Sequence, residues 1–166
     1  MEFFDVIHAR RSVRQYMSQP VSRSVLEQIA QAGNEAPTGC NAQLKQYVIV
    51  DDPAIMDQLR PISKAMTDAP AAIVLLADPK PTAYGEFWIQ DASAAMAQML
   101  LAAVALGYAG CWIEGAVRRA EDSIRRILNV PGHLRVWSMM PVGLPAGDQP
   151  RVAKPALADV LHVNGY

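Results

Sequence analysis

The stretch Arg10-Arg11-Ser12-Val13-Arg14 places three guanidinium groups and one hydroxyl within five residues, near the start of a chain of 166 residues. A guanidinium is a planar fork of hydrogen-bond donors that stays charged near neutral pH. Together with the short Ser12 donor, such forks suit a dianionic phosphate, because charge-assisted hydrogen bonds are stronger than neutral ones. The formal net charge of the chain is −1, so this positive charge is a local feature. The alternative is a solvated basic turn, which this stretch alone leaves open.

Length and composition predict one globular domain over residues 1–166. Hydrophobic residues make up 51% of the chain and charged residues 19%, a balance that supports a sizeable core and argues against disorder. The near-zero net charge argues against nucleic acid as a general partner.

The chain shows no targeting or membrane segment. Glu2 and Asp5 interrupt its first turns, so no signal peptide is evident. The longest apolar stretch, Ala92–Ala109, contains polar and glycine residues and predicts a buried helix rather than a membrane span. We therefore expect a cytoplasmic protein with no membrane contact, in which Cys40 and Cys111 are reduced thiols.

The spacing of apolar residues predicts alternating helices and strands, and hence a mixed α and β class. Helices are expected at Glu2–Arg10, from the N-cap Ser22 to Ala32, at Ala54–Arg60, at Glu86–Leu106 and at Arg119–Leu128. Strands are expected at Tyr47–Val50, Ala71–Ala77, Cys111–Ile113 and Val136–Val142. The remaining expectations are a helix stop at Gly33-Asn34, a loop at Lys80–Tyr84, an extended arm at Pro145–Pro155 and a last turn around Leu157–Leu161.

Three further stretches follow the arginine-rich one in a fixed order. They are Ala36–Gln43, which reads Ala-Pro-Thr-Gly-Cys-Asn-Ala-Gln, then Leu106–Gly115, and the tail His162–Tyr166. In order and spacing, the four stretches resemble the FMN-dependent nitroreductase family over almost the whole chain. The resemblance implies an α+β fold, a three-layer sandwich whose central, mostly antiparallel sheet is flanked by helices. It also implies an intertwined homodimer with the long helix at its core, flavin sites at the interface and a possible further strand from the partner's tail.

The resemblance assigns the basic residues to the charged end of FMN. Arg10, Ser12 and Arg14 match the phosphate anchor of the family, and Arg11 stands where the family has a basic residue near the ribityl chain or the ring. A basic pair near the C-terminus, Arg151 and Lys154, would close the phosphate site, and the spacing does not choose between its two members.

Two other stretches are assigned to the flavin ring. The backbone amides at Ile113, Glu114 and Gly115 would point at flavin N5 and the adjacent carbonyl, so Glu114 is proposed for its backbone. The mixed donors and acceptors of a small-residue loop would meet the polar edge of the ring. The residues implied in that loop are Pro37, Thr38, Gly39, Asn41 and Gln43. The aromatic residue that the family has after this glutamine is replaced by Leu44-Lys45.

The expected function is an FMN-dependent oxidoreductase. It would pass hydride or electrons from NADH or NADPH, bound transiently, to an electron-poor small molecule such as a nitroaromatic or a quinone, in a ping-pong cycle. No side chain is expected to be catalytic, because flavin N5 does the chemistry. Two alternatives stay open: a flavin-binding or flavin-sensing protein without turnover, and a family member that fragments flavin or removes halogen reductively.

Several residues that could carry chemistry are better explained by structure. His8, His133 and His162 lie far apart in the sequence, so no metal site is predicted. Phe87 and Trp88 could line a substrate cleft, but packing beneath the long helix is favoured.

Overall fold

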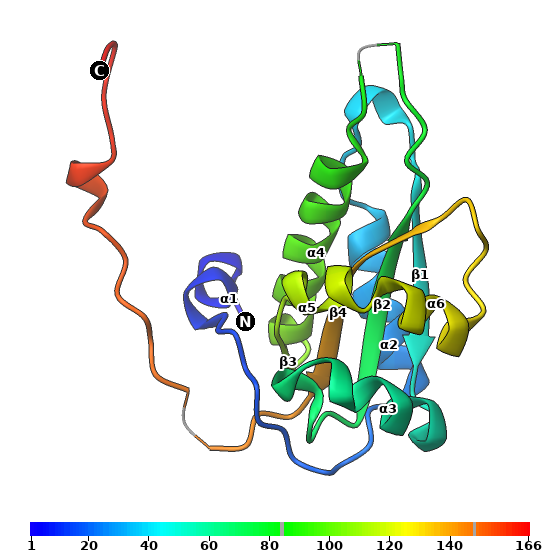
Figure 1. The fold of residues 1–166 in the computed structure, drawn as a ribbon. Helices are drawn as coiled ribbons and strands as arrows, with labels where there is room; N and C mark the ends of the chain where they lie inside the picture. Colours follow the sequence, from blue (N-terminus) through cyan, green and yellow to red (C-terminus); the bar gives the residue numbers. More distant parts are fainter. Residues whose placement is uncertain (84, 148) are drawn as a thin grey trace.

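The computed structural model describes residues 1–83, 85–147 and 149–166 (Figure 1). Its helices are α1 (Phe3–Ala9), α2 (Arg23–Asn34), α3 (Pro53–Leu59), α4 (Trp88–Ala105), α5 (Gly115–Arg119) and α6 (Glu121–Leu128). Its strands are β1 (Lys45–Val50), β2 (Ala71–Ala77), β3 (Ala109–Gly110) and β4 (Arg135–Gly143). Tyr84, the last residue of the predicted Lys80–Tyr84 loop, and Asp148, within the predicted arm, lie outside the described residues.

The strands form one sheet in the order β1-β2-β4-β3, and each neighbouring pair is antiparallel. Strand β2 lies between β1 and β4, and all its side chains are buried. A strand that is covered on both faces is expected to be continuously apolar, which explains the uninterrupted run from Ala71 to Ala77. The predicted antiparallel sheet is confirmed.

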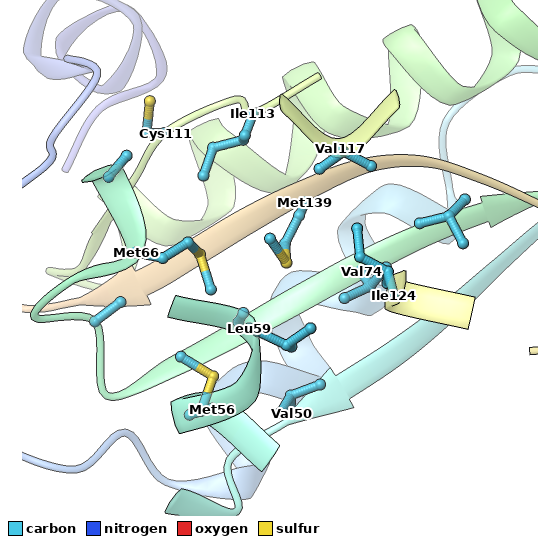
Figure 2. Close-up of a cluster of buried hydrophobic side chains, with 14 of the residues drawn as sticks. Val50, Met56, Leu59, Met66, Val74, Cys111, Ile113, Val117, Ile124 and Met139 are labelled. Carbon is cyan, nitrogen blue, oxygen red and sulfur yellow. The ribbon is translucent and has the colours of Figure 1, made fainter. Parts of the chain in front are cut away.

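Helices α3, α5 and α6 cover one face of this sheet. Their apolar side chains meet those of the central strands in a buried cluster, which Figure 2 shows. Leu59 of α3, Val117 of α5 and Ile124 of α6 all lie in this cluster with Val74 of β2 and Met139 of β4. The cluster removes several large side chains from water and so attaches three helices to the sheet.

Helices α2 and α4 cover the opposite face through a second buried cluster, so the predicted three-layer arrangement is confirmed. Gly33 lies where α2 packs on α4: a Cβ added there would come within 2.8 Å of the Met99 Cγ. The helix stop predicted at Gly33-Asn34 falls at the end of α2, which continues to Asn34, two residues beyond the predicted Ala32. Gly33 itself lies inside the helix and allows the close approach of α2 and α4.

The third strand is not at Cys111–Ile113, as predicted, but at Ala109–Gly110. Gly110 pairs with Val142 of β4, and a Cβ at this position would lie 2.9 Å from the Pro141 carbonyl oxygen. Ile113 makes only an isolated bridge to Met139. The lack of a side chain at Gly110 therefore decides where the backbone joins the sheet.

The predicted helix Arg119–Leu128 is α6, which begins two residues later than predicted, and the short helix α5 that precedes it was not predicted; Ala120 separates the two. Ala120 has φ −108° and ψ 13°, outside the helical region. The long helix α4 also begins two residues later than predicted and ends one residue earlier. Trp88 packs inside as expected, edge-to-face with Trp137 at a ring-centroid distance of 5.1 Å.

The segment that follows α1 runs along the sheet, first beside β3 and then beside the chain that leaves β4. Ser12 makes a parallel bridge with Gly110, and Tyr16 makes an antiparallel bridge with Pro145. Beyond these bridges α1 and the C-terminal segment lie outside the layered body, and the segment leads away from it (Figure 1). Residues 151–166 are all exposed. Within the described residues, no helix has the length and apolar character that crossing a membrane requires.

Candidate functional site

A cavity of about 510 Å³ lies between the arginine-rich stretch and the start of the C-terminal segment. Six of the predicted site residues line it, and they come from both ends of the chain: Arg10, Arg11, Ser12, Arg14, Arg151 and Lys154. The other lining residues are Ile7, His8, Gln149, Pro150 and Val152. The structure thus brings together the basic residues that sequence reasoning assigned to one site, and we call this space the cationic cavity.

Among the described residues, the lining of the cationic cavity contains no negative side chain. Five of these lining residues carry permanent positive charge at neutral pH, and none of them is Asp or Glu. Among the described residues, these five cations take part in no ion pair. Like charges placed together without counter-charges raise the free energy of the fold. A dianion such as a phosphate monoester would offset that repulsion, and the donor set fits it.

Backbone hydrogen bonds fix the arginine-rich stretch against the sheet. The Val13 N–H donates to the Gly110 carbonyl at 3.0 Å, and the Val13 and Tyr16 side chains are buried. The Tyr16 hydroxyl donates to the Val13 carbonyl. Arg14 between them is left exposed, so the local fold directs the buried side chains inward and leaves the guanidinium at the surface.

Cys111 lies buried behind this stretch and is a free thiol, as predicted, and so is the exposed Cys40. Burial raises the pKa of the Cys111 thiol. The charge of Arg14, a hydrogen bond with Ser12 and the charge of Arg10 each lower it by less. The thiol is therefore next to the cationic cavity but held in its neutral form.

The chain passes from β3 through Ile113 to the first residues of α5. Gly115 begins this helix and is exposed, and the first N–H groups of a helix have no intrahelical partner. A Cβ at Gly115 would meet only the Arg119 guanidinium, at an ordinary 3.7 Å, so the fold itself does not require glycine here. The Glu114 carboxylate lies 3.7 Å from Arg118, along the helix, which suits the prediction that Glu114 acts through its backbone.

The predicted ring-edge residues lie together in the segment Pro37–Gln43, which we call loop 37–43. Cys40, Asn41 and Gln43 have φ of 53°, 54° and 53°, in the left-handed region that residues other than glycine seldom adopt. The Gln43 side-chain amide donates to the Asn41 side-chain oxygen at 3.0 Å, and the Gln43 N–H donates to the Thr38 hydroxyl at 3.2 Å. The polar groups of the loop are thus held on its exposed side.

Loop 37–43 does not line the cationic cavity, and neither do Ile113, Glu114 and Gly115. Figure 1 shows why for the loop: it lies at the end of the sheet near the start of α4, whereas α1 and the first part of the C-terminal segment lie toward the other end of α4. Ile113–Gly115 is closer, because Gly110 pairs directly with Ser12. Within one chain, the residues predicted to bind the phosphate therefore lie together. The junction Ile113–Gly115 lies next to them, whereas loop 37–43 lies at the other end of the sheet.

Sequence reasoning missed three polar residues at these places. His8 and Gln149 line the cationic cavity, and His8 could have been suggested by its position two residues before Arg10. Asp91 accepts a hydrogen bond from loop 37–43; its only signal was a single acid within a long apolar helix. Lys45, which replaces the expected aromatic wall, donates instead to the carbonyls of Gly33 and Ala36.

The layered fold and the cationic cavity define a three-layer α+β protein with a site suited to an anionic ligand, and comparison with known proteins gives its family. The sequence profile of the Nitroreductase family matches residues 7–66 and 61–144. A protein of Archaeoglobus fulgidus provisionally named NADH dehydrogenase/NAD(P)H nitroreductase is 34% identical over 157 residues, which span 89% of this chain and 88% of that protein.

Two solved structures are similar along their whole length. A Bacteroides thetaiotaomicron protein with the same provisional name has a TM-score of 0.87 and 27% identity, covering 99% of this chain and 98% of that chain. An FMN-dependent nitroreductase of Clostridium difficile has a TM-score of 0.84 and 26% identity, covering 98% and 99%. The chain belongs to the nitroreductase family. The predicted family, fold and general oxidoreductase class are confirmed.

Proposed function

We propose that this chain binds FMN and passes hydride or electrons from NADH or NADPH to an electron-poor small molecule, by a ping-pong cycle in a homodimer. The observation that carries the proposal is the cationic cavity, where five cations and Ser12 line one space, with no ion pair to these cations and no acid in the lining among the residues that the structure describes. The choice of FMN is supported by the similar Clostridium difficile structure, which is called an FMN-dependent nitroreductase. The choice of reductant is supported by the name of the Archaeoglobus fulgidus relative, which includes NAD(P)H.

The residues of the chain divide between the two ends of such a cofactor. Arg10, Ser12 and Arg14 would donate hydrogen bonds to the phosphate oxygens, with Arg151 and Lys154 closing the other side of the cavity. The N–H groups at the start of α5 would donate to the polar edge of the ring. Bound FMN would supply the atom, N5, that accepts hydride from the nucleotide and passes it or its electrons to the acceptor. The contribution of the chain is positioning and electrostatics, so it needs no strong acid or base.

Loop 37–43 and the exposed apolar residues support a dimer. The loop stands apart from the cationic cavity of its own chain, and its exposed Asn41 and Gln43 amides would reach the flavin held by a partner. Apolar side chains are also exposed on α1, on α4 and along the C-terminal segment, where a second copy would cover them. They include Phe3, Phe4, Ile89, Leu106, Leu157 and Val163.

The test is an absorbance spectrum of the purified protein, followed by NADH or NADPH in air. The proposal expects a yellow protein whose visible flavin bands fade on addition of reductant and return as oxygen reoxidises the flavin. Protein that stays colourless and gains no thermal stability with excess FMN refutes it. A yellow protein that neither nucleotide reduces would instead support the alternative of a flavin binder without turnover.

A further inference from the structure

Loop 37–43 is held to the body of the protein by a carboxyl group that is remote in the sequence. The Gly39 N–H donates to the Oδ1 atom of Asp91 at 2.7 Å. Asp91 lies in the first turn of α4 and is only 3% exposed. Its second oxygen, Oδ2, is buried and has no hydrogen-bond partner among the described atoms. A buried carboxyl group is unfavourable unless a specific interaction offsets its desolvation, and the bond from Gly39 is the one hydrogen bond to this carboxyl group that the described residues show.

Phe87 presses on the loop at the same residue. A Cβ added to Gly39 would lie 2.6 Å from the Phe87 Cγ and 2.7 Å from its Cβ and Cδ2. No side chain fits in that space without movement of the ring or of the loop. Gly39 is therefore fixed by Asp91 through its N–H and by Phe87 through its Cα.

Lys45 holds the two ends of the loop together. It follows the loop closely in sequence, and its Nζ donates to the Ala36 carbonyl at 2.7 Å and to the Gly33 carbonyl at 3.2 Å. Burial lowers the pKa of Lys45, while Asp91 and Glu35 act in the opposite direction. Asp91 therefore lies within electrostatic reach of Lys45. It accepts a hydrogen bond from Gly39 within the loop and attracts the ammonium group of Lys45, which holds the ends of the loop.

These contacts explain how three left-handed residues can follow Gly39. Conformations of this kind persist only where the surrounding structure constrains them. The hydrogen bonds within the loop join its own residues, so they cannot fix its place relative to the sheet. The bond to Asp91 does, because α4 is packed into the core along most of its length.

We propose that Asp91 is a positioning residue, which holds loop 37–43 where its Asn41 and Gln43 amides meet the flavin ring. The inference rests on the proposed function, since the flavin is what the loop would meet. It adds a residue that does not touch the cofactor and yet sets the affinity for its ring.

The experiment compares FMN with inorganic phosphate on the full chain. Asp91→Ala removes the acceptor for the Gly39 N–H, Asp91→Asn keeps an oxygen that can accept it, and Ser93→Ala is a control two residues along α4. The dissociation constant for FMN is measured by quenching of flavin fluorescence. The rise in melting temperature with millimolar phosphate reports on the cationic cavity alone. We expect Asp91→Ala to raise the FMN dissociation constant at least tenfold with the phosphate shift unchanged, and Asp91→Asn and Ser93→Ala to stay within threefold of the parent.

A purely structural role would lower the melting temperature of Asp91→Ala but leave its FMN dissociation constant within twofold, and that result refutes the inference. Equal losses for Asp91→Asn and Asp91→Ala refute it as well, because the hydrogen bond would not be the cause. If Asp91→Ala fails to fold, Gly39→Ala tests the same position: it should weaken FMN binding, and adding Phe87→Gly should restore it, because glycine removes both the ring and the Phe87 Cβ that the new methyl group meets. No restoration counts against the inference. A parent protein that does not bind FMN refutes the proposed function, and the inference falls with it.

Discussion

The replacement Arg10→Ala removes one forked donor from the wall of the cationic cavity. A hydrogen bond to a charged group contributes about 1.5–3 kcal/mol, which corresponds to about a 10- to 150-fold rise in the dissociation constant of FMN. The fold should tolerate the change, because Arg10 makes no ion pair among the described residues and its side chain is not part of either buried cluster.

The assay is a fluorescence titration of FMN at two salt concentrations, with riboflavin as a second ligand. Riboflavin lacks the phosphate, so its affinity should not change with Arg10→Ala. The effect on FMN should shrink at high salt, which screens exposed charges. Arg126→Ala is the matched control, since Arg126 is an exposed arginine on α6 and does not line the cavity.

Unchanged FMN affinity at moderate salt would remove Arg10 from the site. An equal loss of affinity for riboflavin and for FMN would show that the replacement acts on the fold or on the ring, and the phosphate assignment would be wrong. The pair Arg151→Ala and Lys154→Ala, measured in the same way, decides which basic residue of the C-terminal segment contributes, since both line the cavity.

Three further predictions follow from other residues. Gly115→Val should leave the melting temperature nearly unchanged, because a Cβ there meets no backbone, but should block the flavin ring; a yellow, active variant contradicts this. Gly110→Ala should cost about 1–3 kcal/mol of folding free energy in denaturant unfolding, because the new Cβ lies 2.9 Å from a backbone oxygen, and should also weaken FMN binding; unaltered stability contradicts this. The Arg135 side chain holds the pKa of Glu121 below its usual value, so this pair stabilises the fold above about pH 4.5 and loses its effect as the pH falls through the lowered pKa. Glu121→Gln should therefore cost about 1 kcal/mol at pH 7 and flatten the acid limb of stability against pH; an unchanged acid limb refutes the assignment.

Local pattern was enough to predict the elements that the core contains. The run Ala71–Ala77 could only be a strand covered on both faces, and the structure buries every residue of it. The long apolar helix α4 was recognisable for the same reason, although it begins at Trp88 and not at the predicted Glu86. Apolar periodicity reports burial directly, and burial decides these elements.

The errors fall where contacts between distant residues decide. The position of β3 depends on the backbone of Gly110 approaching β4, which the flanking residues do not encode. The helix α5 was missed because its five residues are too few to show an apolar period, and its buried residue Val117 packs on the sheet. Each miss is a case in which tertiary packing overrides propensity.

The candidate site divides in the same way. The residue types of the cationic cavity could be read from the sequence because phosphate demands a recognisable donor set. The partner of Gly39 could not, because Asp91 lies 52 residues away and a single acid in an apolar helix has several explanations. Sequence patterns reveal the groups that would touch a ligand more readily than the groups that hold those in place.

The C-terminal wall of the cavity has a physical consequence for assembly. Arg151 and Lys154 are exposed, as is every residue from 151 to 166, so no core contact within the chain holds this wall in place. The free energy that orders it must come from a bound anion, from a second copy covering exposed residues such as Leu157 and Val163, or from both. If both contribute, FMN binding and dimerisation are linked, and each must strengthen the other by the same factor. Sedimentation at a series of protein concentrations should then show a lower dimer dissociation constant with FMN than without it, and an equal constant would mean that the wall is already ordered in the single chain.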